Sequence, residues 1–272
     1  AQLRHELALI GELGLDSYFL IVADIVRFAR EAGIAHQGRG SAANSLVAYL
    51  LGISPIDPIA VELVFERFLS RERPRPPDID IDFAADRREE VIQYVYHRYG
   101  RDHAAMACTL VTYRARSAVR DVARALGFPS ALAERLSKQL NVHHDESVRR
   151  GADLTRNFGA DLSAAAYQHL LHLAPRLHGM PRHLGIHNGG MILSGPPLAT
   201  LMPIEPATMP ERTVVQWDKE ALEDAGLIKI DILGLRMLSA VQDAVVLIEK
   251  SGAPPVDLDR IPPDDPEVYA ML

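Results

Sequence analysis

Three aspartates alternate with large apolar residues in the segment 77–83, which reads Pro-Asp-Ile-Asp-Ile-Asp-Phe. This period of two predicts a half-buried β-strand with Asp78, Asp80 and Asp82 on one face, about 6.5–7 Å apart along the backbone. Carboxylates in such a row repel one another unless a cation lies over them, and Mg²⁺ prefers carboxylate, water and phosphate oxygens. We therefore predict a metal site; the alternative is the polar face of an ordinary strand. The spacing alone fits either Asp78 with Asp80 or Asp80 with Asp82.

Two charged residues close together interrupt a second apolar segment, residues 227–236. The alternation predicts a buried strand with Lys229 and Asp231 on one face and three isoleucines on the other. One interpretation is a salt-bridged edge strand. The other is that Asp231 brings a third carboxylate to the metal site and that Lys229 lies beside it to bind phosphate.

A glycine-rich turn precedes an apolar segment that ends at Leu51. We expect Gly38, Arg39 and Gly40 to deliver Ser41 to the start of a helix, where backbone N–H groups and the helix dipole favour a phosphate. The alternative is a flexible turn with Ser41 as the N-cap. Four arginines precede the acidic strand, either solvated or as partners for phosphates held by metal; they are Arg67, Arg71, Arg73 and Arg75.

The middle of the chain is basic and helical in character. Arg116, Arg120 and Arg124 recur every four residues and form one stripe beside the apolar positions Val119 and Val122. With Arg114, this stripe either contacts a nucleic-acid backbone or is ordinary solvated surface. Because the helical segment interrupts the strand-bearing parts, we interpret it as an inserted subdomain, with a polar break at 141–151.

Three histidines, His178, His183 and His187, raise the alternative of a zinc site. No Cys or Glu stands at ligand spacing, so we expect buried, hydrogen-bonded histidines that orient a loop. Cys108 is expected to be a packing residue. The remaining periodicity predicts helices at 3–13, 17–32, 57–69, 86–99, 162–174 and 219–225, and strands at 104–112 and 212–217.

Composition sets the broad class of the protein. The chain has 272 residues, 48% of them apolar, a net charge of −7 and one cysteine. We expect one large or two modest domains, a reducing cytoplasmic location, no disulfide framework and no membrane span. The net charge argues against a uniformly basic nucleic-acid binder. We expect the sequence to be a piece of a longer polypeptide.

Taken together, these motifs resemble the C-family bacterial replicative polymerases, the DNA polymerase III α subunit group. The segments that carry the resemblance, in family order, are Gly38-Arg39-Gly40-Ser41, Phe65-Glu66-Arg67-Phe68-Leu69, Pro77 to Phe83, Gly185-Ile186-His187 with Gly189-Gly190, and Lys229 to Arg236. The form of residues 36–45, with Ala43-Asn44, most resembles the error-prone, damage-tolerant branch; the replicative branch of the same family is the alternative.

The resemblance implies a two-metal DNA polymerase. Asp80, Asp82 and Asp231 would hold two Mg²⁺ ions, and their removal is expected to abolish activity while the metal-free fold stays intact. The dNTP would be bound by residues around the glycine turn and the arginines, namely Arg39, Gly40, Ser41, Arg67, Arg73 and Lys229. The primer–template duplex would be bound by Arg114, Arg116, Arg120 and Arg124.

The family fold is α+β, a polymerase-β-like nucleotidyltransferase palm with a mixed sheet, interrupted by a helical thumb. This implies a palm at 1–111 and 184–236, a thumb at 112–183 and the start of the fingers at 237–272. A sliding clamp and other repair or replication proteins would bind through regions outside this sequence. The rival hypotheses from other classes are a metal-dependent phosphohydrolase and a non-catalytic nucleic-acid-binding scaffold.

Overall fold

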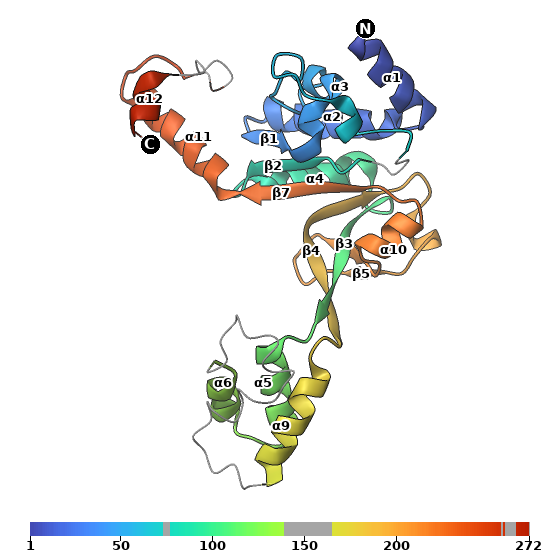
Figure 1. The fold of residues 1–272 in the computed structure, drawn as a ribbon, viewed down its shortest axis with the longest axis vertical. Coiled ribbons are helices and arrows are strands. Elements are labelled where there is room, and N and C mark those ends of the chain that lie inside the picture. The colour runs from blue at the N-terminus through green and yellow to red at the C-terminus, as the bar shows by residue number, and fades with distance from the viewer. Residues whose placement is uncertain (73–76, 139–164, 257, 259–264, 272) are drawn as a thin grey trace. The chain divides into compact units, whose positions relative to one another are not determined.

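The computed structural model describes residues 1–72, 77–138, 165–256, 258 and 265–271. The chain divides into two compact units, residues 1–108 with 186–272, and residues 109–185. Strands β3 (Ala104–Thr112) and β4 (Pro181–Leu193) carry the chain from one unit to the other and back (Figure 1). The fold class predicted from sequence, α+β with a mixed sheet, is confirmed.

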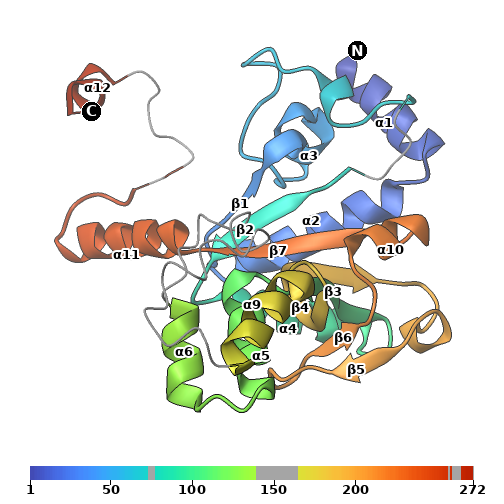
Figure 2. The same ribbon diagram turned by 60° about the horizontal axis from the view of Figure 1, so that its bottom comes forward.

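A seven-stranded mixed sheet forms the framework, in the order β1-β2-β7-β4-β3-β6-β5 (Figure 2). The other strands are β1 (His36–Arg39), β2 (Asp80–Ala84), β5 (Ile204–Pro206), β6 (Thr213–Val215) and β7 (Lys229–Leu235). Strand β2 runs parallel to β7 and antiparallel to β1, while β4 is antiparallel to β7. The two strands that carry the acidic motifs are therefore direct neighbours.

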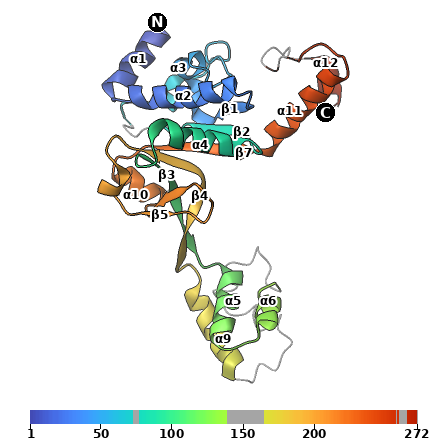
Figure 3. The ribbon, with the colours of Figure 1, turned by 180° about the vertical axis from the view of Figure 1, so that it is seen from behind.

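The predicted alternation along β2 is confirmed. Ile79, Ile81 and Phe83 are fully buried, whereas the aspartates between them keep contact with solvent. Helix α4 (Arg88–Tyr99) covers one face of β2 and β7, as the opposite views in Figures 1 and 3 show. Burial of the apolar face fixes the register of the strand, because a slip of one residue would send the carboxylates into the core.

The other helices of this unit are α1 (Gln2–Glu12), α2 (Asp16–Glu31), α3 (Leu46–Leu50), α10 (Lys219–Asp224), α11 (Arg236–Lys250) and α12 (Pro266–Met271). Among the described residues, no helix combines the length and the apolar character that crossing a lipid bilayer requires.

An aromatic stack and two hydrogen bonds hold α2 against α4. Phe28 stacks on Tyr94 with ring centroids 4.0 Å apart, and the hydroxyls of Tyr94 and Tyr99 donate to Asp24 at 2.8 and 2.9 Å. Burial alone would raise the pKa of Asp24, but these hydrogen bonds and the contact with Arg27 outweigh it, so the pKa is lowered.

In the described part of the second unit, three helices pack together, α5 (Ala115–Ala125), α6 (Ser130–Lys138) and α9 (Ala165–Leu177) (Figure 1). Val119, Leu136 and Leu170 belong to its separate apolar core. The predicted polar break at 141–151 lies outside the described residues.

Two local predictions are wrong. Residues 57–69 form turns and the short 3₁₀ helix η2 (Phe65–Arg67) instead of an α-helix. The turn that Asp57 caps ends at Glu62, whose φ of 53° is incompatible with a continuing helix. Gly38 and Arg39 were expected to belong to the glycine-rich turn, but they pair with β2 and form part of the extended strand β1.

Candidate active site

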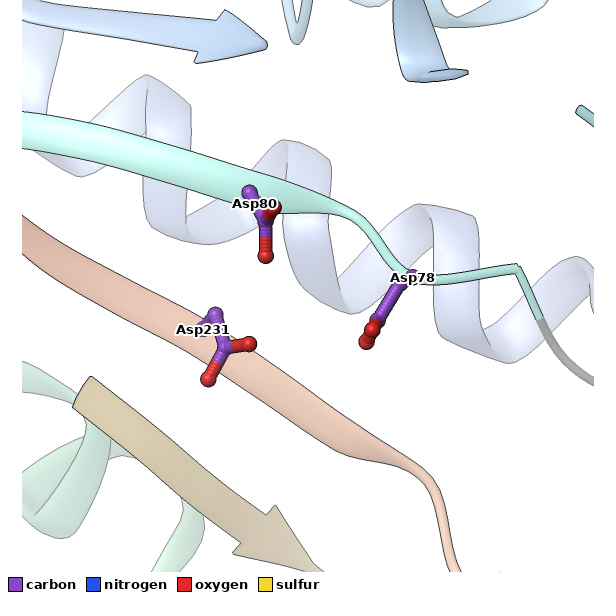
Figure 4. A group of neighbouring side chains, drawn as sticks. All are labelled: Asp78, Asp80 and Asp231. Carbon is purple, nitrogen blue, oxygen red and sulfur yellow. The ribbon is translucent and has the colours of Figure 1, made fainter. Parts of the chain in front are cut away.

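The strand register brings together carboxylates that are far apart in the sequence. Asp80 of β2 stands opposite Asp231 of β7 in the parallel ladder. Asp78, two residues before Asp80, joins them, and one carboxylate oxygen from each of the three lies within 4.8 Å of the others (Figure 4). Burial raises the pKa of Asp80, and the nearby carboxylates of Asp231 and Asp78 raise it further.

Two lysines neutralise part of this charge. Lys229 forms an ion pair with Asp231 on its own strand, and both side chains are more than nine-tenths buried. The Lys229 ammonium also lies 3.6 Å from Asp78 Oδ1, and Lys219 Nζ lies 3.0 Å from Asp78 Oδ2. Burial of Asp78 acts to raise its pKa, but the two lysines outweigh that effect and the pKa is lowered.

Asp82 lies on the same face of β2 but outside this group of three. Its Oδ2 atom is 3.2 Å from Nε of Arg39, whose guanidinium also lies 3.8 Å from Asp80. Arg39 is placed there by the β1–β2 ladder, in which it stands opposite Asp80. The structure thus brings Asp78 nearest to Asp80 and Asp231, and the metal-binding role of Asp82 stays a prediction.

One oxygen of Asp231 indicates that a cation fits here. Oδ1 is buried and has no hydrogen-bond partner among the described residues. His187 Nδ1 is 3.8 Å away, but that nitrogen accepts the Gly190 N–H at 2.7 Å and so has no proton to donate. A buried acceptor without a partner is costly, and carboxylate oxygens are the ligands that hard divalent cations prefer.

Glycines let strands β4 and β7 approach each other closely beside Asp231. A Cβ at Gly189 would lie 2.6 Å from the Ile232 carbonyl oxygen, and one at Gly190 would lie 2.8 Å from both Lys229 and His187. His187 accepts a backbone N–H of its own strand β4, not of a loop. His183 is exposed, and His178 and His187 are half-buried, so the prediction of buried histidines that orient a loop is wrong. Burial nevertheless lowers the pKa of His187. Within the described part of the chain, the only group of potential metal ligands consists of aspartates, which does not support the zinc alternative.

The glycine turn is built differently from the prediction. After β1, residues Gly40–Asn44 form the 3₁₀ helix η1, and helix α3 begins at Leu46 with Ser45, not Ser41, as its N-cap. Gly38 is required because a Cβ there would lie 2.0 Å from the Ile53 carbonyl oxygen. Gly40 has a φ of +69°, a conformation that favours glycine.

A buried glutamate occupies the start of α3. The carboxylate of Glu6, from α1, accepts the backbone N–H groups of Leu46 and Val47 at 3.0 Å and the Ser45 hydroxyl at 2.9 Å. The positive end of this helix is therefore already bound to a carboxylate within the chain. The sequence analysis missed Glu6, since nothing local connects it to a turn about 40 residues away.

The remaining predicted site residues are spread over both units. Arg67 is exposed in η2, and Arg73 lies outside the described residues. Arg114, Arg116 and Arg124 are exposed at or on α5, while Arg120 is half-buried. Arg120 lies 3.4 Å from Asp121, which also pairs with Arg182 at 3.1 Å. Among the described residues, the predicted basic site residues that lie beside the carboxylates are Arg39 and Lys229.

Comparison with known proteins gives the family. The model of the bacterial DNA polymerase III alpha NTPase domain matches residues 1–234. The chain belongs to this family. The family resemblance predicted from the sequence motifs is therefore confirmed.

Relatives within this polymerase III alpha family are named error-prone DNA polymerase. The proteins of Methylococcus capsulatus, Aromatoleum aromaticum and Mycobacterium bovis are 50%, 51% and 48% identical to the chain, and each alignment covers all of it. The chain spans about a quarter of the length of these curated relatives, 26%, 25% and 24% respectively.

Proposed function

We propose that the chain carries the catalytic centre of an error-prone, template-directed DNA polymerase. The reaction would add deoxynucleoside monophosphates from dNTPs to a primer 3′ hydroxyl and release pyrophosphate. The observation that carries this proposal is the register that sets Asp80 beside Asp231, with one Asp231 oxygen lacking a partner. That geometry occurs in a chain about half identical, along its whole length, to proteins named error-prone DNA polymerase.

Asp80, Asp82 and Asp231 are the proposed ligands of two Mg²⁺ ions. When bound, such ions would make the primer hydroxyl more acidic and neutralise charge on the triphosphate. In the absence of metal, basic side chains of the chain form ion pairs with two of these acids. Arg39 pairs with Asp82, and Lys229 pairs with Asp231. Each would release its carboxylate when metal binds, and each could then pair with a phosphate of the nucleotide.

The proposed nucleotide site lies at the glycine turn. Gly40 and Ser41 would bind the triphosphate through their own backbone N–H groups. The first N–H groups of α3 do not serve this purpose, because they already donate to Glu6. Arg39, Arg67, Arg73 and Lys229 are the proposed cationic partners. The exposed position of Arg39, next to Asp80 and Asp82, supports its part in this set.

The proposed domain roles follow the family. Residues 1–111 and 184–236 would form a polymerase-β-like palm, 112–183 a thumb and 237–272 the start of the fingers. The separate core of the 109–185 unit supports an inserted thumb. We propose that the enzyme acts in the bacterial cytoplasm and that a sliding clamp and other repair or replication proteins contact other regions of the whole protein.

The test is primer extension by the complete polypeptide with Mg²⁺ and each dNTP. Separate changes of Asp80, Asp82 and Asp231 to Asn should each lower extension by roughly a thousandfold, because each removes a metal ligand. Asp102→Asn, which changes an exposed aspartate elsewhere in the same unit, is the matched control and should extend normally. Normal extension by Asp231→Asn would contradict the proposal, and release of inorganic phosphate without a primer would favour a phosphohydrolase.

The arginine stripe of α5 is the proposed duplex contact. Arg116, Arg120 and Arg124 would bind phosphates without reading bases, which suits an enzyme that accepts any sequence. Reversal of all three to Glu should weaken primer–template binding and reduce the slope of log affinity against log salt by about 0.9 per lost contact. Binding isotherms at several salt concentrations measure this slope, and an unchanged slope would assign the stripe to ordinary surface.

A further inference from the structure

The hydroxyl of Tyr18 holds the backbone on both sides of Asp78. Tyr18, in α2, is 4% exposed; its hydroxyl donates to the Pro77 carbonyl oxygen at 3.0 Å and accepts the Ile79 N–H at 3.1 Å. Strand β2 begins only at Asp80, where its ladder with β1 also begins. The phenol thus satisfies backbone groups that precede the sheet, and it fixes the segment that carries Asp78.

Asp78 gives Lys229 a second carboxylate. Lys229 is paired with Asp231, and its ammonium lies 3.6 Å from Asp78 Oδ1. The Asp78 side chain is 48% exposed, and a cavity of about 280 Å³ is lined by Asp78, Lys219 and Lys229 among others. The Lys229 ammonium therefore has a second carboxylate beside it, and the cavity that it lines with Asp78 is not lined by Asp231.

A divalent cation at the unpartnered Oδ1 of Asp231 would lie close to the Lys229 ammonium, which is paired with Oδ2 of the same carboxylate. Two positive charges within a few ångströms repel each other, and in a buried site solvent screens this repulsion only weakly. Lys229 itself is buried, so moving away from Asp231 without another carboxylate would leave its charge uncompensated. A nearby carboxylate that accepts the lysine therefore strengthens cation binding at Asp231.

We propose that Tyr18 is a positioning residue for the metal-dependent reaction. By fixing Asp78, it holds in place the carboxylate to which Lys229 withdraws when a divalent cation binds Asp231. This inference rests on the proposed function, because it requires a cation at Asp231.

The test measures Mn²⁺ binding to the complete polypeptide, with free Mn²⁺ quantified by electron paramagnetic resonance. The difference between the parent protein and Asp231→Asn isolates binding at this site. Tyr18→Phe keeps the ring and all charges but removes both hydrogen bonds, and it should weaken binding at this site about fivefold. Asp78→Glu, which keeps the charge but moves the carboxylate, should have a similar effect and carries the same test if Tyr18→Phe fails to fold.

A matched control separates positioning from general loss of stability. Tyr96 is equally buried, and its hydroxyl likewise bonds one backbone carbonyl and one backbone N–H, both of Thr213, at 3.2 and 3.1 Å. Tyr96→Phe therefore removes the same kinds of hydrogen bond away from the carboxylates. It should leave the Mn²⁺ affinity unchanged.

The decisive comparison repeats these changes in a Lys229→Met background. There the lysine no longer needs an acceptor, so Tyr18→Phe and Asp78→Glu should cause no further loss of Mn²⁺ affinity. A loss that persists without Lys229 would mean that Asp78 binds the cation directly, which overturns the proposal. Equal affinities for Tyr18→Phe and Tyr96→Phe would also overturn it. Unchanged Mn²⁺ binding by Asp231→Asn would instead reject the metal site itself, and the inference with it.

Discussion

Without metal, Asp231 should stabilise the protein, because it is the main partner of a buried lysine. The side chains of Lys229 and Asp231 are 8% and 9% exposed. Removing one partner of a buried ion pair costs about 3–5 kcal/mol. The half-exposed Asp78 remains 3.6 Å from Lys229 and recovers part of this loss, so Asp231→Asn should lower the free energy of unfolding by about 2–3 kcal/mol. This replaces the expectation from the sequence that loss of a repelling carboxylate leaves the metal-free fold intact.

Urea unfolding with a chelator present measures this difference. Trp217 is the single tryptophan and lies in the unit that holds the site, so its fluorescence reports on that unit. The double change Lys229→Met with Asp231→Asn should be more stable than Asp231→Asn alone by about 1–2 kcal/mol, since no charge is then left buried and unpaired. Strictly additive effects, or an Asp231→Asn protein within about 0.5 kcal/mol of the parent, would refute this reasoning.

Three further predictions concern the framework around the site. Glu6→Gln should lower the free energy of unfolding by about 2 kcal/mol, since an amide cannot accept all the hydrogen bonds that the carboxylate accepts; the exposed Glu12→Gln is its control in the same urea titration. Gly38→Ala should lower the melting temperature, because its Cβ meets a backbone carbonyl oxygen, whereas Gly195→Ala meets nothing within 4 Å and should not. The stability that the Asp24 carboxylate supplies over Asp24→Asn should be complete above the unfolded-state pKa of 3.8 and disappear as the pH falls through its depressed folded-state pKa; a gap between the two proteins that stays constant with pH would contradict this.

The parts of the site that could be predicted from the sequence are the strands in which apolar and charged residues alternate. Alternation predicted a half-buried strand at 77–83 and a buried strand within 227–236, together with the face of each that carries acids, because burial of isoleucine fixes the register. The placement of Asp80 opposite Asp231 could not be derived this way, since it depends on which strands become neighbours. The family resemblance linked the two segments where periodicity could not.

Two omissions come from long-range contacts, and one error comes from a local backbone turn. Glu6 caps a helix from about 40 residues away, and Tyr18 bonds the backbone at 77–79 from another helix. Neither leaves a local signal, because a glutamate or a tyrosine on an amphipathic helix is ordinary. The expected helix at 57–69 failed for the opposite reason: apolar spacing was present, but the backbone turn at Glu62 ended it.

The adjacency of β2 and β7 also has a consequence for the order of folding. About 150 residues separate Asp80 from Asp231, and closing so long a loop costs conformational entropy that grows with the logarithm of its length. The chain leaves and rejoins the sheet through the neighbouring strands β3 and β4, and residues 109–185 have a core of their own. If that unit folds first, the flexible part of the loop is about halved, which lowers the closure cost by about 0.6 kcal/mol. During synthesis β7 would then be the last of the seven strands to join, so the carboxylates would converge only after the inserted unit had formed.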